Sequence, residues 1–200
     1  MSQVRTFIAI KLPEPVLTEI DRLKAELGRQ PASSAARWVA TPSIHLTLKF
    51  LGEIGASRLQ DVFDAVDLAC AERTPFELTL GDLGCFPNAR RPRVVWVGVQ
   101  EPTGRLLALQ RAIENELAKA GFPRERRAFK PHLTLARIRK TASRAEASLF
   151  GQIIAQAKLK NRPVFCVRAI HVIKSDLRPT GPIYTSLHEV PLTHTDTPSS

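Results

Sequence analysis

The sequence predicts a duplicated fold in which strands and helices alternate, and two features of the chain lead to that prediction. The tetrapeptide His-Leu-Thr-Leu occurs twice, at residues 45–48 and 132–135. Each half of the chain also presents the same series of elements, namely strand, helix, motif strand, helix and strand. Because a duplicated unit places equivalent strands about an approximate two-fold axis, we expect the two motifs to face each other across a cleft.

The spacing within the two halves supports this duplication. His45 lies about 38 residues after Phe7 in the first predicted strand, and His132 lies about 37 residues after Val95 in its counterpart. We therefore predict one domain built of two pseudo-symmetric lobes, followed by a polar, disordered tail. The domain covers 1–192, its repeat halves cover roughly 4–86 and 92–190, and the tail covers 193–200.

Local signals define the elements of the first half. Pro13 and Pro15 end an apolar, β-rich run and suit the first turn of a helix, which Gly28 can close. Ser57 and Gln60 form a capping-box pattern at the start of the next helix. The predicted elements are a strand at 5–12, a helix at 16–28, a loop at 29–41, the motif strand at 44–51, a helix at 57–70 and a strand at 75–83.

Equivalent signals define the second half. Thr103 is placed to cap a helix that Gly121 closes, and Ser143 with Glu146 forms a second capping-box pattern. The predicted elements are a basic turn at 88–93, a strand at 94–99, a helix at 103–121, a charged loop at 124–127, the motif strand at 131–138, a helix at 143–157 and strands at 163–173 and 183–190.

The charge balance of the chain indicates a polyanionic partner. Its 29 Lys and Arg against 19 Asp and Glu give a net charge of +10, and nucleic acid and membrane surfaces are the usual partners of such proteins. No apolar run approaches the roughly 20 residues of a membrane-spanning helix, and the N-terminus lacks the pattern of a signal peptide. We therefore expect a cytoplasmic protein whose Cys70, Cys85 and Cys166 are reduced thiols.

The motif residues suit acid–base chemistry on a phosphate. On a strand, His45 and Thr47 point to one face while Leu46 and Leu48 point to the other, where they can be buried. The second motif places His132 and Thr134, and Leu133 and Leu135, in the same way. With an ordinary pKa near ~6.5, one neutral imidazole can remove a proton while a protonated one delivers another. Threonine hydroxyls and a nearby cation can hold the phosphate oxygens.

Which cation takes that role is open from the sequence alone. Arg137 follows His132 by five positions, so on a regular strand the two side chains would lie on opposite faces. A twist or bulge could bring Arg137 round, and Lys49 or Arg139 could supply the charge instead. No motif residue is an acidic residue or a cysteine, so a zinc site would lack ligands, and we predict neither a metal nor another cofactor.

The remaining histidines have simpler interpretations. His171 lies within a predicted strand and His188 near the end of another, and both are expected to be structural. His194 lies in the polar tail and is expected to have no role. The arginines of 88–93 and 124–127 gain interest as possible contacts for a polyanion because the second of these runs directly precedes a motif.

The motifs and the sequence segments around them resemble those of a known family. The two HxTx motifs in a duplicated chain are similar to those of the two-histidine (2H) phosphoesterases. The longer sequence segments resemble those of the bacterial and archaeal RNA 2′,3′-cyclic phosphodiesterases, also called 2′-5′ RNA ligases. These segments are RxFIAIxLP at 5–13, W…HLTLKFLGE at 38–53, PRVVWVGV at 92–99, FxPHLTLAR at 129–137 and SxLxPxGxxY at 175–184.

This resemblance implies a bilobal α+β fold with two antiparallel sheets facing each other across a central groove and helices on the outside. It implies metal-independent hydrolysis of an RNA terminal 2′,3′-cyclic phosphate to a 2′-phosphate, with possible reverse 2′-5′ ligation. It assigns His45 as proton donor, His132 as proton acceptor, and Thr47, Thr134 and Arg137 to phosphate binding. By residue type alone, the two histidines are interchangeable.

Other functions stay open at this point. The same fold could act on another small cyclic phosphate or nucleotide, or the chain could be an RNA-binding module without turnover. A metal-dependent phosphoesterase is a third alternative. The expected partner is RNA with a 2′,3′-cyclic phosphate end. We expect the protein to be a monomer that binds no membrane and needs no obligatory protein partner.

Overall fold

The structure is a computed structural model that describes residues 2–179 and 181–193. Its order of elements follows the predicted repeat. The elements are β1 (Gln3–Lys11), α1 (Glu14–Gly28), β2 (Ala36–Trp38), β3 (His45–Gly55), α2 (Leu59–Cys70), β4 (Phe76–Phe86), β5 (Val94–Gln100), α3 (Arg105–Lys119), β6 (His132–Ile138), α4 (Arg144–Gln156), β7 (Val164–Val167), β8 (Ala169–Arg178) and β9 (Gly181–Pro191).

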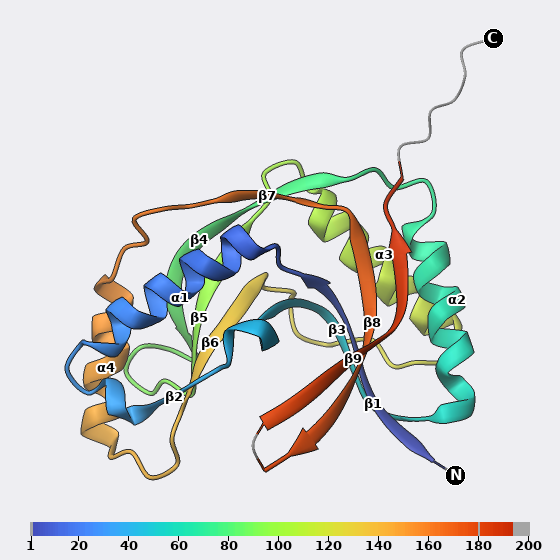
Figure 1. The fold of residues 1–200 in the computed structure, drawn as a ribbon. Coiled ribbons are helices and arrows are strands. Elements are labelled where there is room, and N and C mark those ends of the chain that lie inside the picture. The colour runs from blue at the N-terminus through green and yellow to red at the C-terminus, as the bar shows by residue number, and fades with distance from the viewer. Residues whose placement is uncertain (1, 180, 194–200) are drawn as a thin grey trace.

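The strands form one strongly curled antiparallel sheet in the order β7-β4-β5-β6-β3-β1-β8-β9, with β2 paired to β6 (Figure 1). The predicted α+β class with antiparallel pairing is therefore confirmed. We call β3-β1-β8-β9 the first half-sheet and β6-β5-β4-β7 the second. The two half-sheets are joined through one pair of residues, Leu46 of β3 and Leu133 of β6. We call this junction the seam, and both motifs lie at it.

Each half-sheet contains strands from both sequence halves. The last strand of the first half, β4, pairs with β5, and β8 of the second half pairs with β1. The boundaries of the half-sheets are therefore not those of the predicted repeat halves. This exchange ties the two halves into one body, because neither half-sheet is complete without a strand from the other half of the chain.

Figure 1 shows α2 and α3 on one flank of the sheet and α4 on the other, while α1 crosses in front of β4 and β5. The pair α2 and α3 packs together and contacts the first half-sheet through β3, β8 and β9, while α4 contacts β4 of the second. The apolar faces of all four helices and the sheet residues beneath them form one continuous core. Burial of this apolar surface is the main stabilising contribution, at roughly 25 cal/mol per Å².

Helix starts were predicted with mixed success. Ser143 and Glu146 form the complete capping box of α4. The expected cap by Ser57 is wrong, because a 3-10 turn precedes α2 and Arg58 takes the cap position. The expected cap by Thr103 is also wrong: Gly104, with φ of 84°, is the cap residue of α3, and the Thr103 hydroxyl bonds to Glu101 instead.

Two strand predictions need correction. The run at 163–173 was predicted to be one strand, but it contains β7 and the start of β8, which lie in different half-sheets. Its apolar pattern runs on from one strand to the next because both have buried positions, Phe165 and Val167 in β7 and Ile170, Val172 and Ile173 in β8. The region 29–41 was predicted to be a loop, yet it contains β2, whose three residues are too short for a recognisable alternation.

Other expectations concern the cysteines, the membrane and the tail. All three cysteines are free, and burial raises the pKa of the Cys70 thiol to about 12 and that of Cys85 to about 11. Among the described residues, no helix is both long and apolar enough to cross a membrane. The predicted disordered tail, with His194, lies outside the described residues except for Thr193.

Candidate active site

The two motifs expose their polar residues on one face of the sheet, which we call the motif face. The leucines Leu46, Leu48, Leu133 and Leu135 are almost completely buried on the helix side. His45, Thr47, His132 and Thr134 alternate with them and are only partly buried. Because Leu46 pairs with Leu133 across the seam, the two His-Thr pairs lie on neighbouring strands of the sheet.

Both imidazoles are held in the same way by the backbone. Nδ1 of His45 lies 2.9 Å from the carbonyl oxygen of Ser43, and Nδ1 of His132 lies 2.6 Å from the carbonyl oxygen of Lys130. A carbonyl can only accept, so Nδ1 donates in each case. In the neutral form, Nε2 of each ring therefore has a free lone pair and can act as a base, and in the charged form it carries a proton to give.

Aromatic side chains fix the rings from their flanks. Phe7 stacks on the His45 ring at 4.5 Å between centroids, and Tyr184 of β9 meets the same ring edge-on at 5.2 Å. Phe86 meets the His132 ring at 4.9 Å, and Trp96 lies beside it at 6.3 Å. These contacts restrict ring rotation. Phe7 is buried, and its ring supports that of His45.

Neither Phe86 nor Trp96 is among the predicted site residues. Trp96 pairs with Thr134 in the ladder between β5 and β6, which places both on the motif face. The sequence offers no signal for this role beyond the apolar run that contains Trp96. The ring of Trp96 lies over Gly84 of β4, where any Cβ atom would overlap it.

Burial lowers the pKa of both histidines. For His45, desolvation favours the neutral ring, and the hydrogen bond to Ser43 partly opposes this effect. For His132, desolvation is again the largest cause, the bond to Lys130 opposes it, and the positive charge of Arg137 lowers the pKa further. Both pKa values thus lie below the ordinary 6.5.

A β-bulge brings Arg137 to the motif face. Trp96 of β5 pairs with Thr134 of β6, but the next residue of β5, Val95, pairs with Ala136, so Leu135 is an extra residue in β6. Leu135 and Ala136 are both fully buried. The alternation is therefore shifted by one residue, and Arg137 emerges on the same face as the histidine five positions before it.

The first motif strand has the equivalent bulge. Thr47 pairs with Ala9 and Lys49 with Ile8, so Leu48 is the extra residue, and Leu48 and Lys49 are both buried. The residue that corresponds to Arg137 is Phe50, which is 50% exposed. The guanidinium of Arg5 lies 4.6 Å from the centre of the Phe50 ring.

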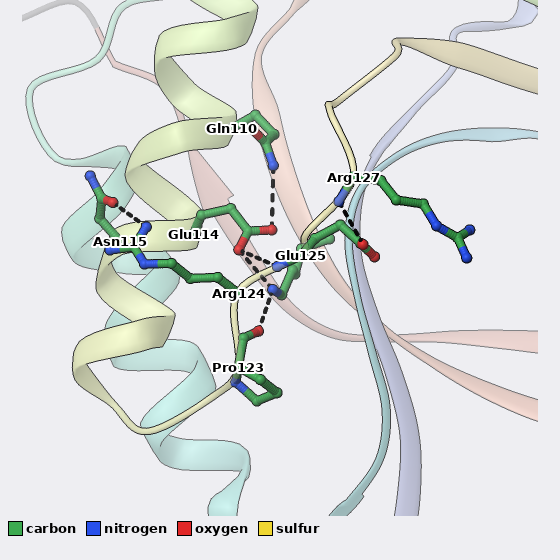
Figure 2. Close-up of polar contacts among 8 residues, drawn as sticks. Gln110, Glu114, Asn115, Pro123, Arg124, Glu125 and Arg127 are labelled. Carbon is green, nitrogen blue, oxygen red and sulfur yellow. Dashed lines mark hydrogen bonds and ion pairs between the residues drawn. The ribbon is translucent and has the colours of Figure 1, made fainter.

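Lys49, one of the alternative cations, is directed away from the motif face. Its Nζ donates to Glu114 Oε2 at 2.8 Å and to the carbonyl of Pro123 at 2.7 Å. Glu114 also accepts from the Gln110 side chain and the Glu125 backbone (Figure 2). Lys49 therefore anchors the loop before the second motif to the first motif strand and to α3.

The other predicted cations also lie apart from the histidines. Arg139 donates from Nε to the carbonyl of Ser34 at 3.2 Å. In the charged loop, Arg124 donates to Asn115 at 2.6 Å (Figure 2). The basic turn at 88–93 borders a hollow of about 910 Å³ beside α4, and no motif residue lines it.

The two remaining described histidines make structural contacts. His171 lies 3.4 Å from both Ser186 and Glu189 of β9, within the first half-sheet. His188 bonds to Asp67 at 2.8 Å and thereby links β9 to α2. Among the described residues, no three His, Cys, Asp or Glu side chains cluster as metal ligands.

A partly buried pair of aligned imidazoles, each beside a threonine, on a duplicated α+β scaffold defines a two-histidine phosphoesterase. Comparison with known families agrees: the sequence model of the 2′-5′ RNA ligase superfamily matches residues 12–179. The chain belongs to this superfamily.

Curated relatives extend over nearly the whole chain. An RNA 2′,3′-cyclic phosphodiesterase of Methanothermobacter thermautotrophicus is 35% identical over 92% of this chain and 97% of its own length. A protein of the same name from Thermotoga maritima is 32% identical over 93% of this chain and 94% of its own. The resemblance drawn from the motifs is thus confirmed at the level of family.

Solved structures show the same fold. The protein TT0787 of Thermus thermophilus superposes with a TM-score of 0.76 at 26% identity, covering 94% of this chain and 97% of that one. Escherichia coli LigT complexed with 3′-AMP gives a TM-score of 0.74 at 27% identity, covering 96% of this chain and 99% of that one.

Proposed function

We propose that this protein hydrolyses the 2′,3′-cyclic phosphate at the 3′ end of an RNA and leaves a 2′-phosphate, without a metal ion. The observation that carries the proposal is the pair of imidazoles on one face, each with Nδ1 bonded to a carbonyl and with no hydrogen bond to Nε2 from the described part of the chain. The names of the curated relatives support the reaction, and the net charge of +10 suits an RNA substrate.

In the proposed reaction, neutral His132 removes a proton from water through Nε2 as the water oxygen bonds to phosphorus. The bond from phosphorus to the 3′ oxygen breaks, and protonated His45 delivers its Nε2 proton to that oxygen. The bond to the 2′ oxygen is kept, so the product is a 2′-phosphate. Acid–base help of this kind contributes roughly 10²–10⁴-fold per group.

Thr47, Thr134 and Arg137 hold the non-bridging phosphate oxygens in this proposal. Both hydroxyls lie two residues from a catalytic ring on the same face, and the bulge at Leu135 brings the guanidinium to that face. The charge of Arg137 stabilises the phosphate as negative charge develops on it. It also disfavours a second positive charge on His132, which supports the assignment of His132 as the base.

The same groups could run the reaction in reverse, with a 5′-hydroxyl in place of water, and would then form a 2′-5′ linkage without ATP. Both motifs are supplied by one chain, so the proposal takes a monomer to be sufficient, with no obligatory protein partner. It places the reaction in the cytoplasm, where RNA ends are available.

The test uses purified protein in EDTA with a short RNA that ends in a 2′,3′-cyclic phosphate, assayed across pH ~5 to ~9, where histidines titrate. A 2′-phosphate product that is lost in both His45→Ala and His132→Ala would support the proposal. RNA binding without turnover would indicate a binding module instead. Turnover of a nucleoside cyclic phosphate alone would indicate a different substrate, and loss of activity in EDTA would refute the metal-free mechanism.

A further inference from the structure

A second arginine lies directly beside Arg137. In the ladder between β2 and β6, Arg37 pairs with Arg137 and Trp38 pairs with Ala136. Ala136 is fully buried, and the Trp38 ring contacts the buried Phe150 of α4 with 6.2 Å between centroids. Trp38 and Ala136 therefore point to the helix side, so Arg37 and Arg137 point together to the motif face.

These two positive charges have no carboxylate partner among residues 2–179 and 181–193. Both side chains are exposed, and neither makes an ion pair with a carboxylate within the described part of the chain. Arg22, Arg58 and Arg162, by contrast, each bond to a carboxylate. Like charges directly opposite each other on a sheet are destabilising. The pair therefore costs stability in the free protein, and an anion with more than one charged group would relieve that cost.

Arg37 lies at the end of β6 that is remote from His132. Position 137 is five residues beyond the histidine, and Arg37 is one strand further across. The next backbone contacts at this end are Ile138 with Arg93 and Arg139 with Ala35. A phosphate held at Arg37 would thus be separate from the phosphate that reacts between the two imidazoles.

We propose that Arg37 binds the phosphodiester immediately upstream of the reacting nucleotide, so that the RNA strand leaves the site over β2. The inference rests on the proposed function, since it assigns Arg137 to the terminal cyclic phosphate. A guanidinium suits this task because its planar donors match two phosphate oxygens at once. Arg37 is then a positioning residue that distinguishes an RNA end from a mononucleotide.

The test compares two substrates in three proteins: the wild type, Arg37→Gln and a matched control, Arg168→Gln. Arg168 is also exposed, but it lies between β7 and β8, neither of which pairs with β6. One substrate is a short RNA with a 2′,3′-cyclic phosphate end. The other is a nucleoside 2′,3′-cyclic phosphate, which has no upstream phosphodiester.

For Arg37→Gln we expect kcat/KM on the RNA to fall by about tenfold, close to 1.4 kcal/mol, while kcat/KM on the mononucleotide stays unchanged. The salt dependence of RNA binding should also weaken, with the slope of log K against log salt reduced by about 0.7, the share of one phosphate on a single strand. Arg37→Lys should restore most of the slope, and thermal stability should not fall.

Equal losses on both substrates would overturn the inference, because Arg37 would then belong to the terminal phosphate site. No loss on either substrate, or the same loss in Arg168→Gln, would overturn it as well. If the wild type turns over neither substrate, the proposed function fails. The salt slope of RNA binding would still decide whether Arg37 contacts a phosphate, because that measurement needs no turnover.

Discussion

Replacing Lys49 by Met should destabilise the protein strongly, because the ammonium group belongs to a buried ion pair. The Lys49 side chain is 5% exposed and that of Glu114 is 10% exposed, with 2.8 Å between Nζ and Oε2. Met fills a similar volume but provides no charge and no donor. The carboxylate of Glu114 would keep only the Gln110 side chain at 3.4 Å and the Glu125 backbone at 3.2 Å.

The size of the loss follows from the group left behind. Breaking a buried pair by removing one partner costs about 3–5 kcal/mol. For a domain of this size, each kcal/mol shifts the melting temperature by about 2–4 °C, so the melting temperature should fall by about 10 °C. The carbonyl of Pro123 also loses its donor, which adds to the loss.

Calorimetric or circular-dichroism melting of Lys49→Met beside Lys119→Met would check this prediction. Lys119 pairs with Glu116 at 2.8 Å, but its side chain is 72% exposed, and such surface pairs contribute about 0–1 kcal/mol. In the double variant Lys49→Met, Glu114→Leu, part of the loss should be recovered, because no uncompensated charge remains. If Lys49→Met melts no lower than Lys119→Met, the reasoning about burial is wrong.

Three further predictions concern the site. The pH profile of kcat/KM reports the pKa values of the free enzyme, and burial lowers the pKa of both His45 and His132. The form with one neutral and one charged ring is most abundant between these two pKa values, so the optimum of kcat/KM should lie below about pH 6.5. An optimum above about pH 7 would contradict this prediction. Thr134→Val should lower kcat/KM by roughly 10- to 100-fold through loss of a charge-assisted hydrogen bond, measured at an unchanged melting temperature; retention of full activity would remove Thr134 from the phosphate site. Gly84→Ala should displace the Trp96 ring that supports His132 and lower the free energy of unfolding by about 1–3 kcal/mol. Gly28→Ala is the control, because an added Cβ atom there meets no atom within 4 Å. Equal melting temperatures of the two variants would show that the Trp96 ring has room to move.

The candidate histidines and threonines could be predicted from the sequence because their positions follow simple alternation. A strand with polar residues at 45 and 47 and leucines at 46 and 48 has only one sensible orientation. The duplication added the second motif with the same alternation. These features depend on local pattern, which a single sequence contains.

Arg137 and Arg37 show where local pattern is insufficient. The orientation of Arg137 depends on the bulge at Leu135, which is defined by pairing with β5 and is not visible within β6 itself. Arg37 lies on a strand of three residues, which exists because β6 provides an edge for it. In both cases the decisive information is the register between segments far apart in the chain.

The bulges also explain how a duplicated scaffold can give the two histidines different surroundings. Both motif strands have the extra residue at the fourth position of the motif, so residue five after each histidine faces the site in both. In the first half-sheet that residue is Phe50, and in the second it is Arg137. Desolvation is the main cause of the lowered pKa of His132, and the positive charge of Arg137 adds to it, while the corresponding position of the first motif strand carries an uncharged phenyl ring. The proposed assignment of His132 as base and His45 as acid agrees with this difference, because only the strand of His132 carries a cation at that position.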